Sequence, residues 1–180
     1  MNVAATILAT AVAAVSGAAA QTEAVPTVFH EAAELYGIEG GEILYAIALN
    51  ESGRSVDGAF RPWPWTLNVE GRGYYYDSQD EAWAALSEFI AAGHRSIDVG
   101  LMQVNFRWHE ELLVDPYTAL DPQVNVHLGA SVYADVLQGD DPVAAAGRYH
   151  SPGPSAAQRQ RADRYSAKVR HHLASIGADR

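Results

Sequence analysis

The sequence predicts a compact, mainly α-helical domain with one small β-hairpin inserted near its middle, which is an α+β fold class. Three observations support this prediction. Several segments place apolar residues at the three- and four-residue spacing of an amphipathic helix. Two of these segments begin with an Asp-Pro pair, which suits the first turn of a helix. Residues 66–76 are instead rich in β-prone residues and contain two glycines, which is typical of a hairpin.

Two short helices are expected near the start of the domain. Pro26 can open the first helix, which runs through Tyr36 and is stopped by Gly37. The second helix covers about 42–50 and is followed by a loop at Gly53. Both helices are therefore expected to end close to a glycine.

The middle of the chain changes character after residue 60. Pro62-Trp63-Pro64-Trp65 is rigid and aromatic, and it leads into the expected hairpin. Ser78 and Glu81 then form a capping box, the serine and glutamate pair that satisfies the first N–H groups of a helix. The apolar residues of that helix recur at helical spacing: Trp83, Leu86, Phe89 and Ile90.

Three further helices are expected in the second half. Asp121 and Asp141 can each cap a helix whose first residue is proline. The last helix covers about 156–176. One of its faces is apolar: Ala162, Tyr165, Val169, Leu173 and Ile176.

The first twenty residues differ from the rest of the chain. They carry no charge, run apolar from Val3 to Val15 and close with three alanines. This pattern predicts a signal peptide cleaved after Ala20, a periplasmic protein and one domain over 21–180. A disordered or helical alanine-rich start is the alternative, since no Lys or Arg follows Met1. We expect no membrane span, because Ala, Thr, Ser and Gly dilute this stretch.

The composition excludes several kinds of partner. With a net charge of −10, nucleic acid is disfavoured, because phosphate contacts need clustered Lys and Arg. The chain has no cysteine, so disulfides and thiolate chemistry are absent. His30 and His109 each precede a glutamate but lack a second histidine four positions on, so we expect no metal. We expect a monomer that needs no cofactor.

Glu51 is the first candidate for chemistry. Leu44, Ile47 and Ala48 form an apolar stripe, and Glu51 continues that stripe at the next helical position. A carboxyl carried toward the core in this way has a raised pKa, as a general acid near neutral pH needs. The alternative is that the helix ends before Glu51 and its side chain reaches solvent. Periodicity alone leaves both open.

Residues 96–105 are the second candidate. Asp98, Gln103 and Asn105 combine a carboxylate with two amides around Gly100. Amides suit sugar recognition, because each offers both a donor and an acceptor. These residues by themselves favour the other interpretation, a buried turn whose amides bond to neighbouring backbone.

Taken in order, several motifs resemble the lytic transglycosylase domain of the lysozyme-like superfamily, over about 27–175. They are Glu51-Ser52-Gly53, Gly100-Leu101-Met102-Gln103, Asn125 before Gly129, and Ala146 with Tyr149. The insert 62–68, with 98–105 and 148–153, is similar to a narrower branch, the specialised transglycosylases of conjugative transfer and type IV secretion. The resemblance implies an enzyme that cleaves the MurNAc-GlcNAc β-1,4 bond of peptidoglycan. The products would be 1,6-anhydro-MurNAc ends, made during local wall opening for a secretion or conjugation apparatus.

The resemblance also implies roles for individual residues. Glu51 matches the catalytic acid/base, and Ser52 matches a residue that hydrogen-bonds near it. Tyr149 matches an aromatic hydroxyl near the acid. Tyr165 falls where the final helix carries another tyrosine, and it is expected to bind substrate in the groove. Three residues match the floor of the sugar groove: Met102, Gln103 and Asn105.

Other positions depart from the pattern or are ambiguous. His150 stands where an asparagine usually follows the motif tyrosine, and Gly147-Arg148 replaces small apolar residues. Arg161-Ala162 replaces a frequent Glu-Thr pair. Trp63, Trp65 and Trp108 could stack on sugars, although large aromatics more often serve as core or lid residues. Trp63 and Trp65 are interpreted as groove residues, because flanking prolines disfavour burial in regular structure.

Asp98 leaves open whether the reaction is that of a lyase or that of a hydrolase. The segment around it is also similar to the part of animal-type lysozymes that carries their second catalytic carboxylate. A muramidase would use Glu51 and Asp98 together, about 5 Å apart. We favour the lyase reaction, because the branch with the 62–68 insert also carries this aspartate. A non-catalytic glycan-binding assembly factor is the third possibility, which Glu51 with Ser52, Gln103 and Tyr149 argues against.

Overall fold

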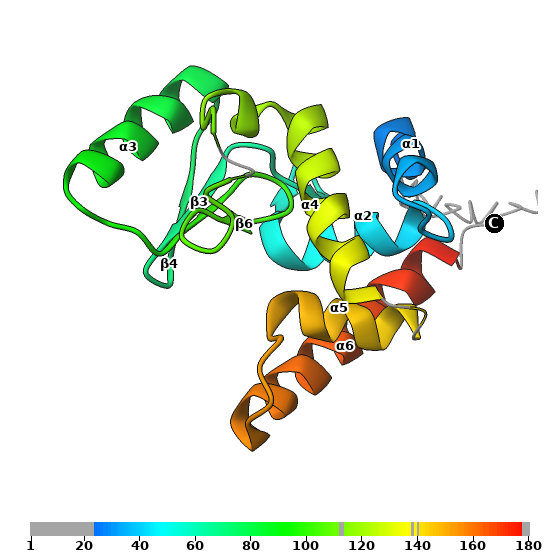
Figure 1. The fold of residues 1–180 in the computed structure, drawn as a ribbon. Coiled ribbons are helices and arrows are strands. Elements are labelled where there is room, and N and C mark those ends of the chain that lie inside the picture. The colour runs from blue at the N-terminus through cyan, green and yellow to red at the C-terminus, as the bar shows by residue number, and fades with distance from the viewer. Residues whose placement is uncertain (1–23, 112–113, 138, 140, 178–180) are drawn as a thin grey trace, which may run out of the picture.

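The computed structural model describes residues 24–111, 114–137, 139 and 141–177. The expected signal peptide lies outside the described residues. The mainly α-helical α+β fold class is confirmed (Figure 1). The helices are α1 (Thr27–Leu35), α2 (Glu42–Ser52), α3 (Gln79–Ala91), η1 (Thr118–Leu120), α4 (Pro122–Leu137), α5 (Pro142–His150) and α6 (Ala156–Gly177). The strands are β1 (Gly53–Val56), β2 (Ala59–Pro62), β3 (Thr66–Val69), β4 (Arg72–Tyr75), β5 (Ile97–Val99) and β6 (Val104–Asn105).

The predicted helix starts are confirmed at their caps. Asp141 accepts from the N–H of Val143 at 3.0 Å. The Ser78 hydroxyl accepts from the N–H of Glu81 at 3.2 Å. The return bond differs from a regular capping box, because the Glu81 carboxylate accepts from the N–H of Asp77 rather than from that of Ser78.

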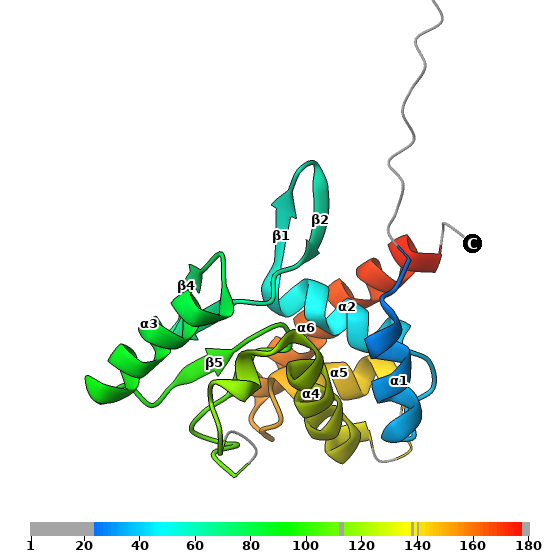
Figure 2. The ribbon, with the colours of Figure 1, turned by 90° about the horizontal axis from the view of Figure 1, so that it is seen from above.

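The β structure is larger than one hairpin. The expected hairpin exists as β3 and β4, with Glu70 and Gly71 both at positive φ in its turn. The loop expected at Gly53 is wrong: β1 and β2 form a second hairpin, which stands out from the helices in Figure 2. Its turn is Asp57-Gly58, again with both φ values positive. Asp-Gly is a strong two-residue hairpin signal, so this turn was readable from the sequence.

The second sheet is antiparallel with the order β4-β3-β5-β6. Asn68 on β3 lies opposite Asp98 on β5, and Asp98 lies opposite Asn105 on β6. Since residues paired across antiparallel strands lie side by side on one face, three polar side chains form a row across this sheet.

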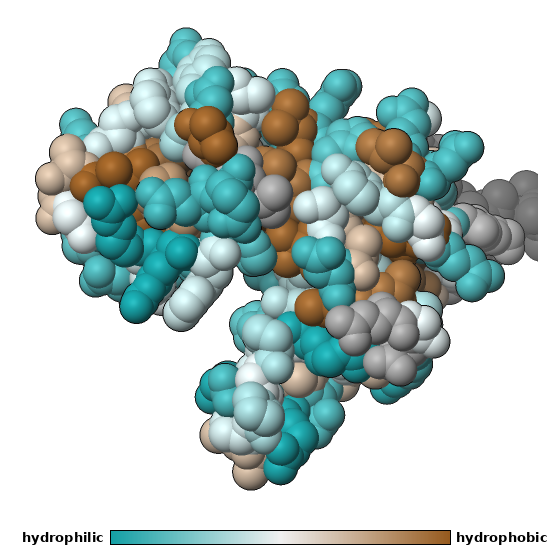
Figure 3. All heavy atoms as spheres, viewed as in Figure 1, coloured by the Kyte–Doolittle hydropathy of each residue, from teal (hydrophilic) through white to brown (hydrophobic). Residues whose placement is uncertain are grey.

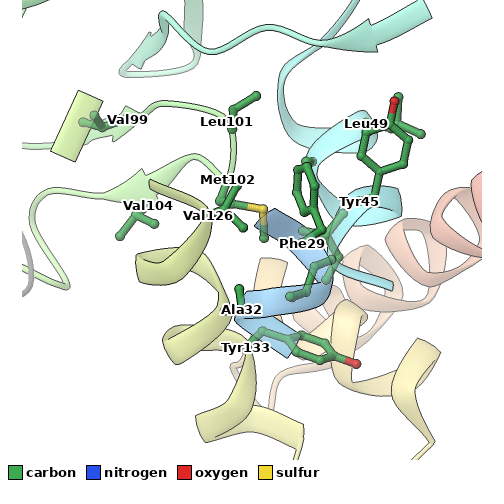
Figure 4. Close-up of a cluster of buried hydrophobic side chains, with 14 of the residues drawn as sticks. Phe29, Ala32, Tyr45, Leu49, Val99, Leu101, Met102, Val104, Val126 and Tyr133 are labelled. Carbon is green, nitrogen blue, oxygen red and sulfur yellow. The ribbon is translucent and has the colours of Figure 1, made fainter. Parts of the chain in front are cut away.

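Helix α2 is the centre of the fold. Every residue from Ile43 to Leu49 is buried. The Tyr45 ring meets the Phe29 ring of α1 edge to face, with 5.2 Å between centroids (Figure 4). Met102 packs against Gly129 of α4, where a Cβ would overlap its side chain. A helix buried on all sides is rigid, so the residues at its end are held firmly.

In Figure 1 the four-stranded sheet and α3 lie on one side of the molecule, α1, α2, α5 and α6 lie on the other, and α4 runs between them. Among the described residues, no helix is both long and apolar enough to cross a membrane.

Candidate active site

A cavity of about 490 Å³ opens between the sheet and the α5 helix. Figure 3 shows the molecule hollowed between the part that carries the sheet and the part that carries α5 and the start of α6. Its lining residues are Glu51, Asn68, Asp98, Gln103, Val104, Asn105, Trp108, His109, Val132, Tyr149, His150 and Pro152. The cavity therefore brings together both candidate segments of the sequence, which meet from opposite sides.

Glu51 lies in the last turn of α2, which continues through Ser52. The interpretation in which the helix ends before Glu51 is therefore wrong. Its side chain is 16% exposed, so the carboxyl is largely desolvated while still facing the cavity. Burial raises the pKa of Glu51 to about 7, and the charge of Asp98 adds to the rise. The Tyr165 hydrogen bond and Lys168 oppose it. Glu51 is thus poised to give up a proton near neutral pH.

Tyr165 is the direct partner of Glu51. Its hydroxyl donates to Oε1 of Glu51 at 2.7 Å, from the buried face of α6. The Tyr165 hydroxyl also has a hydrogen bond with Asn50, the residue before Glu51. Burial and the Glu51 carboxylate raise the pKa of Tyr165 well above its usual value, so the phenol remains a donor. Tyr165 holds the acid and does not line the cavity.

His150 lies on the other side of the same carboxyl. Its Nδ1 is 3.9 Å from Oε1 of Glu51, and its ring stacks on that of Tyr165 with centroids 4.6 Å apart. Burial lowers the pKa of His150, and the positive charges of Arg161 and Lys168 lower it further. At pH values between the lowered pKa of His150 and the pKa of about 7 of Glu51, the imidazole is therefore neutral while Glu51 is protonated.

Asp98 sits in the middle of the polar row across the sheet. Its Oδ1 accepts from Nδ2 of Asn105 at 2.6 Å. Burial raises the pKa of Asp98, and the Asn105 bond opposes that rise. The Oδ1 of Asn105 accepts in turn from the N–H groups of Arg107 and Trp108. Asp98 and Asn105 therefore form a fixed polar wall of the cavity.

The turn between β5 and β6 is held by residues expected at the site. The Ser52 hydroxyl donates to the carbonyl of Leu101 at 2.8 Å, and the Tyr149 hydroxyl donates to the carbonyl of Met102 at 2.7 Å. Gln103 donates to the carbonyls of Thr66 and Gly100. Ser52 was expected to hydrogen-bond near the acid and Tyr149 to carry a hydroxyl near it. Both hydroxyls bond to this turn, and the hydroxyl that donates to Glu51 is that of Tyr165.

Asn125 fixes the same turn from α4. Its Nδ2 donates to the carbonyls of Val99 and Ala119, and its Oδ1 accepts from the N–H of Met102. Gly100 has φ of +79°, and a Cβ there would overlap the Asn125 amide. Met102, which was expected on the floor of the sugar groove, is fully buried and is not among the residues that line the cavity.

Trp63 and Trp65 are not among the residues that line the cavity. The Trp63 indole donates to the carbonyl of Tyr76 at 2.7 Å, and Arg54 lies over its ring. Trp65 packs against the core. Trp108, which is 69% exposed, is the tryptophan that lines the cavity. Trp108 was one of three tryptophans that could stack on sugars, but the sequence interpretation preferred Trp63 and Trp65; Asn68 ends the 62–68 insert and was given no role of its own.

Among the described residues there is no cluster of three or more His, Cys, Asp or Glu that could hold a metal. Comparison of the chain with known protein families, with curated proteins and with solved structures found no match.

Proposed function

We propose that this protein is a peptidoglycan lytic transglycosylase whose acid/base is Glu51. The observation that carries the proposal is the buried carboxyl of Glu51, which has a pKa of about 7 and faces a polar-walled cavity. A protein that only bound glycan would gain nothing from such an acid, whose burial destabilises its charged form. The ordered motifs that resemble the transglycosylase domain supply the substrate class.

The residues that line the cavity fit glycan chemistry in two ways. On the sheet side, Asn68, Asp98 and Asn105 offer donors and acceptors to hydroxyl and acetamido groups. The exposed Trp108 offers a flat apolar face against which a sugar ring can stack. The net charge of −10 gives no long-range attraction to an anionic polymer, so these short-range contacts have to hold the strand.

In the proposed reaction Glu51 protonates the glycosidic oxygen. The C6 hydroxyl of the muramic residue then closes on C1, its proton is taken up, and no water enters the product. In the single-acid form of this reaction the Glu51 carboxylate takes up that proton.

The test is mass spectrometry of muropeptides released from purified peptidoglycan. Anhydro ends are the expected result, and Glu51→Gln should remove nearly all cleavage, because an amide cannot deliver a proton and general acid catalysis contributes roughly 10²- to 10⁴-fold. Circular dichroism should show that this variant is folded. Release by the variant within threefold of the parent, or no products from the parent, contradicts the proposal.

A muramidase is the second candidate, favoured by one observation. Asp98 lines the same cavity as Glu51, and the two carboxyls are close enough for the charge of Asp98 to raise the pKa of Glu51. Retaining hydrolases pair an acid with a second carboxylate in this way. The same mass spectra distinguish the two, because hydrolysis leaves reducing ends.

We also propose that the protein acts in the periplasm, where it opens the wall locally for a secretion or conjugation apparatus. This proposal rests on the alanine-rich start of the chain. It also rests on the resemblance of 62–68 and 148–153 to the specialised transglycosylases of conjugative transfer and type IV secretion. N-terminal sequencing of the exported protein should give Gln21. A mature protein that begins at Met1 contradicts the export route.

A further inference from the structure

His150 and Glu51 form a close pair of proton-transfer groups on one side of the cavity. Their atoms Nδ1 and Oε1 are 3.9 Å apart, and both residues line the cavity. His150 is held by stacking on Tyr165, the ring that also donates to Glu51. The His150 side chain is 44% exposed, so its ring has access to a bound substrate.

We propose that His150 is the general base that takes the proton of the C6 hydroxyl, while Glu51 serves as the acid. The inference rests on the proposed transglycosylase function and divides its two proton transfers between two residues. Burial shifts the two groups in opposite directions: it raises the pKa of Glu51 and lowers that of His150. Near neutral pH this leaves a protonated acid beside an unprotonated base, the pairing that acid–base catalysis uses.

The short separation suits an intramolecular closure. In a β-linked muramic residue, the departing oxygen on C1 and the C6 hydroxyl lie on the same face of the sugar ring. The acid and the base can therefore be neighbours. An inverting hydrolase instead needs its two carboxyls about 6.5–9.5 Å apart, on opposite faces, with a water between.

The proton balance closes without water. Glu51 gives its proton to the glycosidic oxygen as the C1–O bond breaks, and the C6 oxygen bonds to C1 as its proton passes to the neutral imidazole. The products are a 1,6-anhydro end and a free 4-hydroxyl. The imidazolium then returns the proton to the Glu51 carboxylate, directly or through one water, which restores both groups.

Several other charged or titratable groups lie around His150. Arg161, Lys168 and Tyr165 act on it from α6, Tyr149 precedes it on α5, and Glu51, Asp98 and His109 line the same cavity. The two cations disfavour a protonated His150 before substrate binds, which keeps the base available.

The experiment is the pH dependence of kcat/KM for the full chain on purified glycan strands. For the parent, activity should fall on the acid side, because an imidazolium cannot accept a proton. This limb should lie below pH 6.5, the usual pKa of histidine, because burial lowers the pKa of His150. His150→Asn should lower kcat about 10²-fold and remove this acid limb. His150→Phe keeps an aromatic ring against Tyr165 but has no base, so its kcat should fall by the same factor.

His172 provides the matched control. It is a half-buried histidine stacked on Phe60 with its pKa also lowered by burial, and it is not among the residues lining the cavity. His172→Asn should keep kcat within twofold and retain the acid limb. Retention of the limb in His150→Asn assigns it to another group such as Asp98 and overturns the proposal. Full activity in His150→Phe also overturns it, because stacking would then be the role of His150.

A second measurement does not depend on turnover. In an NMR titration, the chemical shift of the His150 ring should change near pH 7, the raised pKa of Glu51, because the carboxyl beside the ring ionises there. Glu51→Gln should remove this change. Ring signals that Glu51→Gln leaves unchanged overturn the pairing, while anhydro products from the parent would still support the transglycosylase function. A parent that releases no products overturns both.

Discussion

The hydroxyl of Tyr165 donates a 2.7 Å hydrogen bond to Glu51 Oε1, although 114 positions separate the two residues. This bond favours the ionised carboxylate and so limits the rise that burial gives the Glu51 pKa. Without it the acid would hold its proton more tightly and donate it less readily. A residue of α6, Tyr165, therefore helps to set the pKa of Glu51 at the end of α2.

Tyr165→Phe should shift the alkaline limb of activity to higher pH and lower kcat. In the proposed reaction activity requires protonated Glu51, so it should fall as pH rises through that group's pKa of about 7. Removal of the hydroxyl removes a stabilising contact to the carboxylate, which raises this pKa further. The measurement is kcat/KM against pH.

Tyr149→Phe is the comparison for that variant. Both phenols are in the interior, but the Tyr149 hydroxyl donates to the carbonyl of Met102 rather than to Glu51. We expect Tyr149→Phe to lower turnover by loosening the turn that carries Gln103, with a smaller shift of the alkaline limb. Equal shifts in the two variants would mean that the Tyr165 bond does not set the acidity of Glu51.

Glu51→Gln should stabilise the folded protein at pH 8. The pKa of Glu51 is about 7 when folded and 4.5 as its ordinary value. The folded state therefore binds the proton more tightly, and the resulting stability is present below pH 4.5 and is lost as pH rises to about 7. The loss is on the order of 3 kcal/mol.

Urea unfolding of parent and Glu51→Gln at pH 4 and pH 8 checks this. A glutamine keeps an acceptor for Tyr165 and carries no charge, so the two proteins should differ little at pH 4 and clearly at pH 8. A variant that is no more stable than the parent at pH 8 contradicts the raised pKa. Such a gain is expected of an acid kept for chemistry at a cost in stability.

Local patterns predicted most of the helices because caps and periodicity act within one turn. Asp141 and Ser78 were readable in this way, and both cap as expected. The four-stranded sheet was not readable in full, because β5 and β6 are very short, β5 joins β3 only through long-range pairing, and β6 joins the sheet through β5. A strand of two or three residues contains too little alternation to be seen.

The periodicity of α2 made Glu51 a candidate acid but left open whether the helix extends to it. The partners of Glu51 could not be predicted, because Tyr165 and His150 reach it through the packing of α5 and α6, which no local pattern encodes. The resemblance named Tyr165, yet as a groove residue. The Trp63 prediction used proline rigidity, which limits backbone conformation but does not say which way an indole points.

Asn125→Ala should destabilise the fold by at least about 3 kcal/mol, because it leaves three buried backbone groups without a partner. Urea unfolding measures the loss. Gln123→Ala, an exposed change on the same helix, should cost less than about 0.5 kcal/mol. Similar losses in the two variants would show that Asn125 does not hold the turn after Gly100.

Asp98→Asn separates the two candidate reactions. A hydrolase needs the Asp98 charge opposite the developing positive charge at the anomeric carbon, so losing it should cost several kcal/mol of transition-state stabilisation, or about 10²- to 10³-fold or more in rate. A transglycosylase needs only a polar wall. There Asp98 accepts from Asn105, and an asparagine oxygen can accept in the same place.

We therefore expect Asp98→Asn to keep at least a tenth of the parent activity and to release anhydro ends. The variant should also lower the pKa of Glu51, because Asp98 no longer contributes a charge that raises it, and the alkaline limb should move to lower pH. A shift of the alkaline limb to lower pH would verify that the side chain at position 98 acts on Glu51. Collapse of activity to the level of Glu51→Gln, with reducing ends in what little product remains, would instead assign the two-carboxylate mechanism to this cavity.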